Sequence, residues 1–320
     1  MSLAVAIQMD RVESIDIDAD STFALALEGK RRGHGLYHYL PTELSYRHGR
    51  IVAKARPMDV QRVKGEHARL GAPETIDLAG LDVVLMRQDP PFDLQYITAT
   101  HLLDQVHPET LVVNNPASVR DAPEKLFVTH FAELMPESLI TYDVDEIKAF
   151  RRQHRDIIVK PLFGNGGIGI FRIKSDDTNF NSLLEMMLAN TREPLMVQRY
   201  LPAIREGDKR IILIDGKPRG AINRVPAQDE TRANLHVGGR AEPATLTSHD
   251  QTICEAIGET LHRKGLIFVG IDVIGGLLTE INVTSPTGIQ EIDRFDGVSL
   301  ASEIWDVIEK RHAQHAQRPS

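Results

Sequence analysis

The chain has 320 residues, of which 42% are hydrophobic and 26% are charged, as in ordinary globular proteins. This length exceeds that of one compact domain and predicts two or three lobes. The formal net charge of −8 excludes the overall basic footprint of a nucleic-acid-binding protein, and no run approaches the roughly 20 apolar residues of a membrane span.

The single cysteine, Cys254, excludes an intrachain disulfide and fits a reducing compartment. It lies in a predicted amphipathic helix, so we expect a buried structural thiol rather than a nucleophile. The apolar run at Ser2–Ile7 is too short for an export signal and has no basic flank before it. We therefore expect a cytoplasmic protein.

Strand and helix patterns alternate in the first third of the chain. A helix is predicted at Ser21–Gly33, with Ser21 as its N-cap and Gly33 as its stop. The other predicted elements are strands at 3–8, 35–40, 81–87 and 110–115 and a helix at 97–106. This alternation predicts a parallel sheet covered by helices. We expect residues 1–122 to form a Rossmann-like α/β lobe.

Two further lobes are expected, a central one at 123–202 and a C-terminal one at 203–311. The central lobe should begin with the helical segment Ser118–Phe131. It should continue with strands at 139–142, 156–162, 168–173 and 195–201 and with helices at 144–155 and 181–191. From Gly207 onward, hairpins alternate with one long helix, Ser248–Lys264, and a last helix covers 299–314. Residues 312–320 are polar and are expected to form a frayed tail.

A glycine-rich loop follows the predicted strand at 156–162. Gly164, Gly166 and Gly169 match G-x-G-x-x-G, but a dinucleotide site requires a helix to start there, whereas 168–173 has the composition of a strand. The unit is therefore predicted to be a hairpin flap whose N–H groups, at Gly164, Gly166 and Gly167, cradle phosphate oxygens. A turn without a ligand is the alternative for the loop taken alone.

Two lysines favour the phosphate-binding interpretation of the loop over a turn without a ligand. Lys160 ends an apolar strand just before the loop, and a buried ammonium needs a partner, which a phosphate would supply. Lys125, at the start of the central lobe, is the second candidate, with a solvated helix lysine as its alternative.

An acidic hairpin lies near the C-terminus. Asp272, Glu280 and Asn282 are embedded in two apolar strands that flank Gly275-Gly276. Oxygen ligands on rigid strands suit Mg²⁺, whereas solvent-facing polar groups on a one-sided sheet are the alternative. A clean two-residue turn pairs Asp272 with Thr279 and separates it from Glu280. An odd-length loop or a compensating bulge puts all three side chains on one face.

Together these motifs resemble the ATP-grasp superfamily and, more narrowly, the bacterial glutathione synthetase family. The matching stretches span most of the chain: 86–93, 114–127, 157–167, 198–210, 230–240 and 265–288. The flap and the acidic hairpin are general to ATP-grasp ligases, whereas DPPFD, GDKR and TEINVTSPTG are specific to the narrower family. Phe163 departs from relatives that often carry Asp or Tyr there.

The resemblance implies an ATP-grasp fold and the ligation of γ-glutamylcysteine and glycine through an acyl phosphate. It implies ATP as co-substrate and two Mg²⁺ ions, with Mn²⁺ as an alternative, held by Asp272, Glu280 and Asn282. Phosphate and nucleotide contacts would come from Lys125, Lys160, the flap glycines, the adenine-binding strand at Gln198, Tyr200 and Leu201, and the ribose contact Asp208. Arg210 would stabilise the transferring phosphoryl group and Arg224 would lie near the substrate, while Arg232 and Arg240 would close from a mobile lid at 226–240.

Three rival interpretations remain open at this point. A sibling ligase with other substrates would share the flap and the hairpin but differ in the first lobe and the lid. A non-catalytic ATP-binding regulatory protein on the same fold could lose metal ligands, so the intact acidic set argues against it. A dehydrogenase, based on the glycine match, is the weakest. The resemblance also suggests a homotetramer, with no nucleic-acid or membrane partner.

Overall fold

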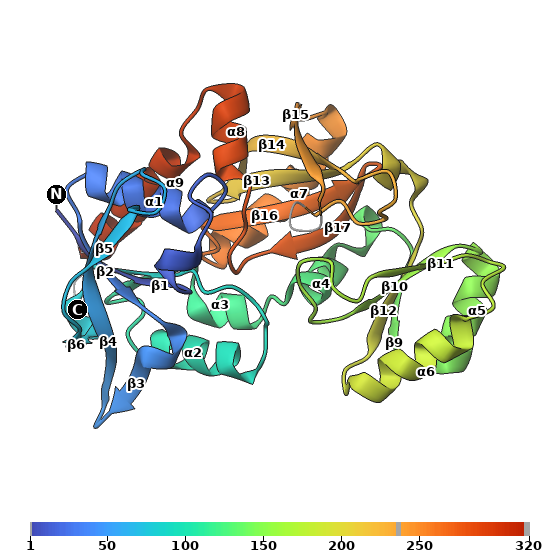
Figure 1. Cartoon of the computed structure of the whole chain (residues 1–320), viewed down its shortest axis with the longest axis horizontal. Coiled ribbons are helices and arrows are strands. Elements are labelled where there is room, and N and C mark those ends of the chain that lie inside the picture. The colour runs from blue at the N-terminus through green and yellow to red at the C-terminus, as the bar shows by residue number, and fades with distance from the viewer. Residues whose placement is uncertain (1, 235–237, 317–320) are drawn as a thin grey trace.

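The computed structural model describes residues 2–234 and 238–316 and contains three sheets. The first belongs to the N-terminal lobe, the second to the central lobe and the third to the C-terminal lobe (Figure 1). The predicted lobe boundaries remain predictions. The first falls between α3 (Pro116–Arg120) and α4 (Glu124–Phe127), and the second falls within the short 3₁₀ helix Pro202–Arg205.

The N-terminal lobe has the predicted parallel sheet and an antiparallel extension that was not predicted. The parallel strands, in spatial order, are β2 (Gly35–Tyr39), β1 (Ala4–Gln8), β7 (Val83–Met86) and β8 (Leu111–Val113). The extension consists of β4 (Arg50–Val60) against β2, with β3 (Leu44–Arg47), β5 (Ala68–Leu70) and β6 (Glu74–Asp77) paired to β4. The helices of this lobe are α1 (Ser21–Arg31), α2 (Leu94–Asp104) and α3.

The predicted cap of α1 was wrong by one residue. Asp20 is the N-cap, because its carboxylate accepts a hydrogen bond of 2.6 Å from the backbone N–H of Phe23, and Ser21 is the first helical residue. The predicted stop is confirmed, since Gly33 follows the C-cap with a φ of 80°.

The central lobe is a four-stranded antiparallel sheet with helices on one face. Its order is β11 (Phe171–Ile173), β10 (Ile157–Pro161), β12 (Leu195–Arg199) and β9 (Ser138–Thr141). Alternate residues of β10 and β12 pack against α5 (Val144–His154) and α6 (Phe180–Asn190). The intervening residues, including Lys160 and Gln198, therefore point to the opposite face. The predicted flap hairpin is confirmed, although its second strand begins at Phe171 rather than at residue 168.

The C-terminal sheet packs against an apolar core on each of its two faces. Its order is β15 (Arg240–Ala244), β14 (Lys217–Val225), β13 (Asp208–Ile214), β16 (Phe268–Ile274) and β17 (Leu277–Asn282). On β13, Ile211 and Leu213 belong to the core that contains α7 (Ser248–Arg263). Ile212 and Ile214 belong to the core of α8 (Ile289–Asp296) and α9 (Leu300–Ala316). Asp208 and Arg210 continue this second face beyond the apolar core.

The last helix joins the C-terminal lobe back to the first. Trp305 of α9 is fully buried and donates a hydrogen bond of 2.9 Å to the carbonyl of Leu25 in α1. The tail predicted at 312–320 was wrong in part, because α9 continues to Ala316; residues 317–320 lie outside the described residues. Helix α8 was not predicted.

The structure also tests the expectation for the single cysteine. Cys254 is fully buried in α7, and burial raises the pKa of its thiol to about 12, so the structural interpretation is confirmed. None of the helices within 2–234 and 238–316 has the length and apolar character needed to cross a bilayer.

Candidate active site

Strand register gathers six of the predicted polar residues on one face of the C-terminal sheet. Asp208 pairs with Arg224 across β13 and β14, and Arg210 pairs with Asp272 across β13 and β16. Asp272 in turn pairs with Glu280 on β17, and Asn282 lies two residues further along. Because directly paired residues of antiparallel strands share a face, all six side chains project from the same side of the sheet.

A bulge decides the question that the Gly275-Gly276 turn left open. The turn is a two-residue loop, since Ile274 pairs with Leu277, and both glycines have the positive φ angles of 57° and 79° that such a turn requires. The register then shifts, so that Asp272 faces Glu280 and Thr279 is the extra residue on β17. The compensating bulge thus brings the two carboxylates to a shared site.

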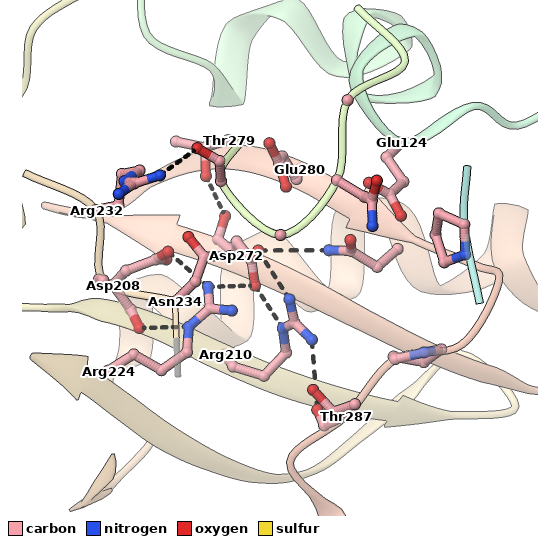
Figure 2. A pocket seen from close by; sticks show the side chains of 18 of the residues that line it. Glu124, Asp208, Arg210, Arg224, Arg232, Asn234, Asp272, Thr279, Glu280 and Thr287 are labelled. Atoms are coloured by element: carbon pink, nitrogen blue, oxygen red, sulfur yellow. Dashed lines mark hydrogen bonds and ion pairs between the residues drawn. The ribbon is translucent and has the colours of Figure 1, made fainter. Parts of the chain in front are cut away.

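Asp272 lies at the centre of a buried ionic network (Figure 2). Its carboxylate contacts the guanidinium of Arg210 at 2.5 Å and that of Arg224 at 2.9 Å, and Arg224 also contacts Asp208 at 2.5 Å. Burial raises the pKa of Asp272, but the two arginines outweigh it and hold the pKa below its usual range. Burial of Asp208 is not offset by Arg224, so its pKa rises to about 7.

Glu280 is held between the two predicted lysines. Its carboxylate lies 3.2 Å from Lys160 Nζ and 3.6 Å from Lys125 Nζ, and both lysines are buried. Lys125 also donates a hydrogen bond of 2.5 Å to the carbonyl of Gly164 in the flap. Burial raises the pKa of Glu280, and the lysines lower it further than burial raises it. Burial lowers the pKa of Lys160 against the opposing effect of Glu280. The solvated-helix alternative for Lys125 is therefore excluded.

The lid segment contacts the flap through its described residues. Arg232 donates a hydrogen bond of 3.1 Å to the carbonyl of Gly167, and its guanidinium also pairs with Glu230. Gly167 has a φ of 79°, and a Cβ there would lie 3.0 Å from Asn234 Oδ1, so the flap and the lid pack closely at this glycine. The predicted lid includes residues 235–237, which lie outside the described residues.

Arg240 does not join the site in this structure. It begins β15, where its side chain is 75% exposed and forms an ion pair with Glu242. Arg240 does not line the cavity in this geometry, so its closure over the ligands stays a prediction.

The predicted adenine strand forms another wall of the same cavity. Gln198 lies near the end of β12, Tyr200 and Leu201 lie just after it, and all three line the cavity. The ring of Tyr200 packs under the guanidinium of Arg172 at 3.8 Å, which fixes its orientation.

One cavity of about 750 Å³ contains these groups. It is lined by all three lobes and includes every predicted site residue except Arg240. Several residues that sequence reasoning missed also line it, and most come from the N-terminal lobe: Asp10, Asp20, Ser21, Arg87, Asp89, Glu124 and Glu291. Arg87 falls within the MRQDPPFD stretch, which supported the family resemblance but was given no role.

Asp272, Glu280 and Asn282 fit a hard divalent cation that is also coordinated by the oxygens of bound phosphates. Within the described ranges, no three His, Cys, Asp or Glu side chains converge on one point. Asp272, Glu280 and Asn282 offer two carboxylates and one amide on the same sheet face, which matches Mg²⁺ bound by few protein ligands together with phosphates. The positive charges of the surrounding lysines and arginines suit the negative charge of the same phosphates.

Comparison with known proteins gives a consistent family assignment. The model of the prokaryotic glutathione synthetase N-terminal domain matches residues 3–120, and the model of the ATP-grasp domain of the same family matches residues 124–297. The chain is 57% identical to a glutathione synthetase of Agrobacterium fabrum, over 96% of each chain. It is 44% identical to one of Escherichia coli, over 98% of this chain and 99% of the relative.

Solved structures support the fold alone. A crystal structure of the D-cycloserine synthetase DcsG superposes with a TM-score of 0.67 at 15% identity, covering 96% of this chain and 100% of that chain. The ATP-grasp ligase PsnB superposes with a TM-score of 0.60 at 15% identity, covering 97% and 100%. The expected ATP-grasp fold is thereby confirmed.

Proposed function

The chain belongs to the prokaryotic glutathione synthetase family, and from this premise we propose how its cavity performs the ligation. The enzyme is an ATP-grasp ligase. The proposed reaction transfers the γ-phosphoryl group of ATP to the cysteinyl carboxylate of γ-glutamylcysteine. The amine of glycine then attacks the acyl phosphate, and phosphate leaves with formation of the peptide bond of glutathione.

The observation that carries the proposal is the concentration of buried cations around two carboxylates on one rigid sheet face. Transfer of a phosphoryl group to a carboxylate brings two anions together, so their repulsion must be neutralised before the reaction. Arg210 and Arg224 meet at Asp272, and Lys125 and Lys160 meet at Glu280. These four cations are held in place before any ligand arrives.

We propose that Asp272, Glu280 and Asn282 hold two Mg²⁺ ions, with Mn²⁺ as a substitute. When bound, the metal supplies charge neutralisation on the transferred phosphates. The same three residues face one corner of the cavity, and Asn282 lies 3.4 Å from Asp272, which supports a shared ligand set.

The nucleotide would lie between the central and C-terminal lobes. Lys125, Lys160 and the backbone N–H groups of the flap glycines would contact the phosphates, while Gln198, Tyr200 and Leu201 would surround adenine. Asp208 Oδ1 is buried and has no hydrogen-bond partner among the described residues, so it is available to accept a ribose hydroxyl.

The carboxylate substrate would lie against the arginines. Arg210 is proposed to stabilise the phosphoryl group in transfer, and Arg224 the acyl phosphate or the substrate carboxylate. Arg232 would shield this centre from water, because it bridges the lid to the flap at Gly167. Shielding matters since an acyl phosphate exposed to water hydrolyses.

We also propose that the enzyme is a homotetramer and acts in the cytoplasm, as the family resemblance suggests. Light scattering coupled to gel filtration tests the first point: a mass near four times 35.7 kDa supports it, and a monomer or dimer contradicts it.

A phosphate-release assay tests the function itself. Release should require ATP, Mg²⁺, γ-glutamylcysteine and glycine together, with glutathione as the product. Equal turnover with D-alanine in place of both amino components would contradict the assignment and favour a sibling ligase.

A further inference from the structure

Glu124 lines the cavity, and the reaction described above gives it no role. It is the first residue of α4, and Phe127 of the same helix is buried in a hydrophobic core. In Figure 2 the side chain of Glu124 points from α4 toward the sheet that carries Asp272 and Glu280. The fold therefore holds this carboxylate beside the centre where the acyl phosphate is proposed to form.

The carboxylate of Glu124 is open to a ligand. Among the described residues, no group donates a hydrogen bond to it, and Lys125 Nζ lies 3.9 Å away, beyond hydrogen-bond distance. A carboxylate that is taken out of bulk water needs donors, and the rest of the protein leaves this one without them. A ligand in the cavity that carries N–H groups would supply the missing donors.

The other acids of the reaction centre are already occupied by cations. Asp272 contacts two arginines, and Glu280 contacts two lysines. The pKa of each of these two carboxyls lies below its usual range, since the cations outweigh the effect of burial. Asp208 contacts Arg224 at 2.5 Å. These three carboxylates are therefore committed to their cations, whereas Glu124 is not.

The surroundings of Glu124 also make it a stronger base than an ordinary carboxylate. Burial is the largest influence, and it raises the pKa of Glu124 to about 7; Glu280 and Asp272 add to the rise, while Lys125 and Arg210 oppose it. A carboxylate with an ordinary pKa would return a proton to water at once. A general base works best when its pKa lies near the operating pH, which is the case here.

We propose that Glu124 is the general base that removes a proton from the ammonium group of glycine before the amine attacks the acyl phosphate. The assignment rests on the proposed function. At neutral pH the nitrogen of glycine is protonated and has no free electron pair, so the attack requires a proton acceptor. The ammonium group also carries the N–H donors that the carboxylate of Glu124 lacks.

The step is balanced in protons and bonds. One proton passes from the ammonium nitrogen to the carboxylate of Glu124, and the freed electron pair forms the C–N bond with the acyl carbon. The bond between that carbon and the phosphate oxygen then breaks. A second proton passes from the nitrogen to the departing phosphate, and Glu124 releases its own proton to solvent.

The test replaces glycine by hydroxylamine, an amine that is largely unprotonated at neutral pH and needs no base. Both nucleophiles react with the same acyl phosphate, glycine giving glutathione and hydroxylamine giving a hydroxamate. In Glu124→Gln we expect glutathione formation at saturating glycine to fall about 100-fold or more, as for loss of a general base. Hydroxamate formation from ATP, Mg²⁺ and γ-glutamylcysteine should stay within about threefold of the wild-type rate.

Two further variants accompany this comparison. Glu124→Asp keeps the charge but draws the carboxylate back by one methylene, so here too glutathione formation should fall more than hydroxamate formation. It provides the same test if the glutamine variant does not fold. Glu133→Gln is the matched control, because it neutralises an exposed glutamate of the neighbouring 3₁₀ helix Val128–Leu134 that does not line the cavity. Both of its rates should stay within about twofold of wild type.

Equal losses of glutathione and hydroxamate formation in the Glu124 variants would overturn the proposal, because Glu124 would then act in the fold or in phosphoryl transfer. Unchanged glutathione formation in Glu124→Gln would overturn it as well. Failure of the proposed function is distinct from both results: the wild-type enzyme would then form neither glutathione nor the hydroxamate.

Discussion

This molecule contains two networks of charged side chains, which differ in how far the protein itself stabilises their carboxylates. The active-site network comprises Asp208, Arg210, Arg224, Asp272 and Glu280 with the two lysines. The helix clamp joins α1 to α9 through Glu28, Arg31, Arg32, Asp306 and Glu309. In the clamp, Arg31 and Arg32 contact Glu28 at 2.6 and 2.8 Å, and Arg32 reaches Asp306 and Glu309 at 2.8 and 3.2 Å.

The pKa values show what the difference means. The hydrogen bond from Arg31, together with Arg32, lowers the pKa of Glu28 to about 2 against the opposing effect of burial. In the cavity, burial raises the pKa of Glu124 and of Asp208 to about 7, although cations lie nearby. The clamp satisfies its acids within the protein, whereas the active site keeps some of its acids in an unfavourable environment that bound ligands would relieve. Perturbed groups of this second kind concentrate at functional sites.

The largest expected effect comes from neutralising one carboxylate in each network and comparing the two variants. Glu280→Gln keeps the shape of the side chain but removes its charge, so we expect kcat to fall at least about 100-fold with little change in Tm. Asp306→Asn in the clamp should do the reverse and lower Tm while kcat stays within about twofold. Steady-state kinetics and thermal melts of both variants measure this. A loss of kcat below threefold in Glu280→Gln, or less than roughly 0.7 kcal/mol of barrier, would show that Glu280 is not a ligand.

The next effect concerns what covers the active-site network. Replacing residues 226–240 by a few glycines should leave ATP binding largely intact, because the proposed nucleotide site lies between the flap and β12. Glutathione formation should fall roughly 10- to 100-fold, and the phosphate released per glutathione should rise above one as water enters.

Measuring phosphate and glutathione in one reaction distinguishes this expected outcome from two others. A ratio of one with an unchanged rate would make 226–240 an ordinary surface loop. A slower rate with a ratio of one would mean that the loop positions substrate without shielding the intermediate.

The clamp predicts a smaller, pH-dependent effect on stability. The pKa of Glu28 in the folded state lies below its unfolded value near 4.5, so its stabilisation is fully present above that value and is lost as the pH falls toward 2. Glu28→Gln should therefore lower the free energy of unfolding by about 1–2 kcal/mol at pH 7, and the gap from wild type should narrow between pH 5 and pH 3. Denaturant titrations across that range provide the measurement, and a constant gap would exclude the ionic contribution.

Sequence reasoning identified the residues of the active-site network, but it did not show how the strands arrange them. The residue types of the acidic hairpin pointed to a metal site, but the parity of the turn could not be settled, because the bulge at Thr279 depends on pairing with β16. Asp20 and Ser21 are both good N-caps, and only the backbone angles distinguish them. The part of the cavity wall that includes Ser21 and Glu291 was missed since these residues come from segments far apart in the chain.

Arg240 shows the limit of assigning roles along a contiguous motif, and it gives the smallest expected effect. Arg232 and Arg240 fall in the same matched stretch, yet Arg232 contacts the flap and Arg240 faces solvent beside Glu242. A surface ion pair contributes about 0–1 kcal/mol, so Arg240→Ala should change kcat/KM less than about twofold, whereas Arg232→Ala should lower it about tenfold or more. Parallel kinetics of the two variants decide the point. Equal losses would mean that the lid carries Arg240 into the cavity during turnover, and the active-site network would then extend to the start of β15.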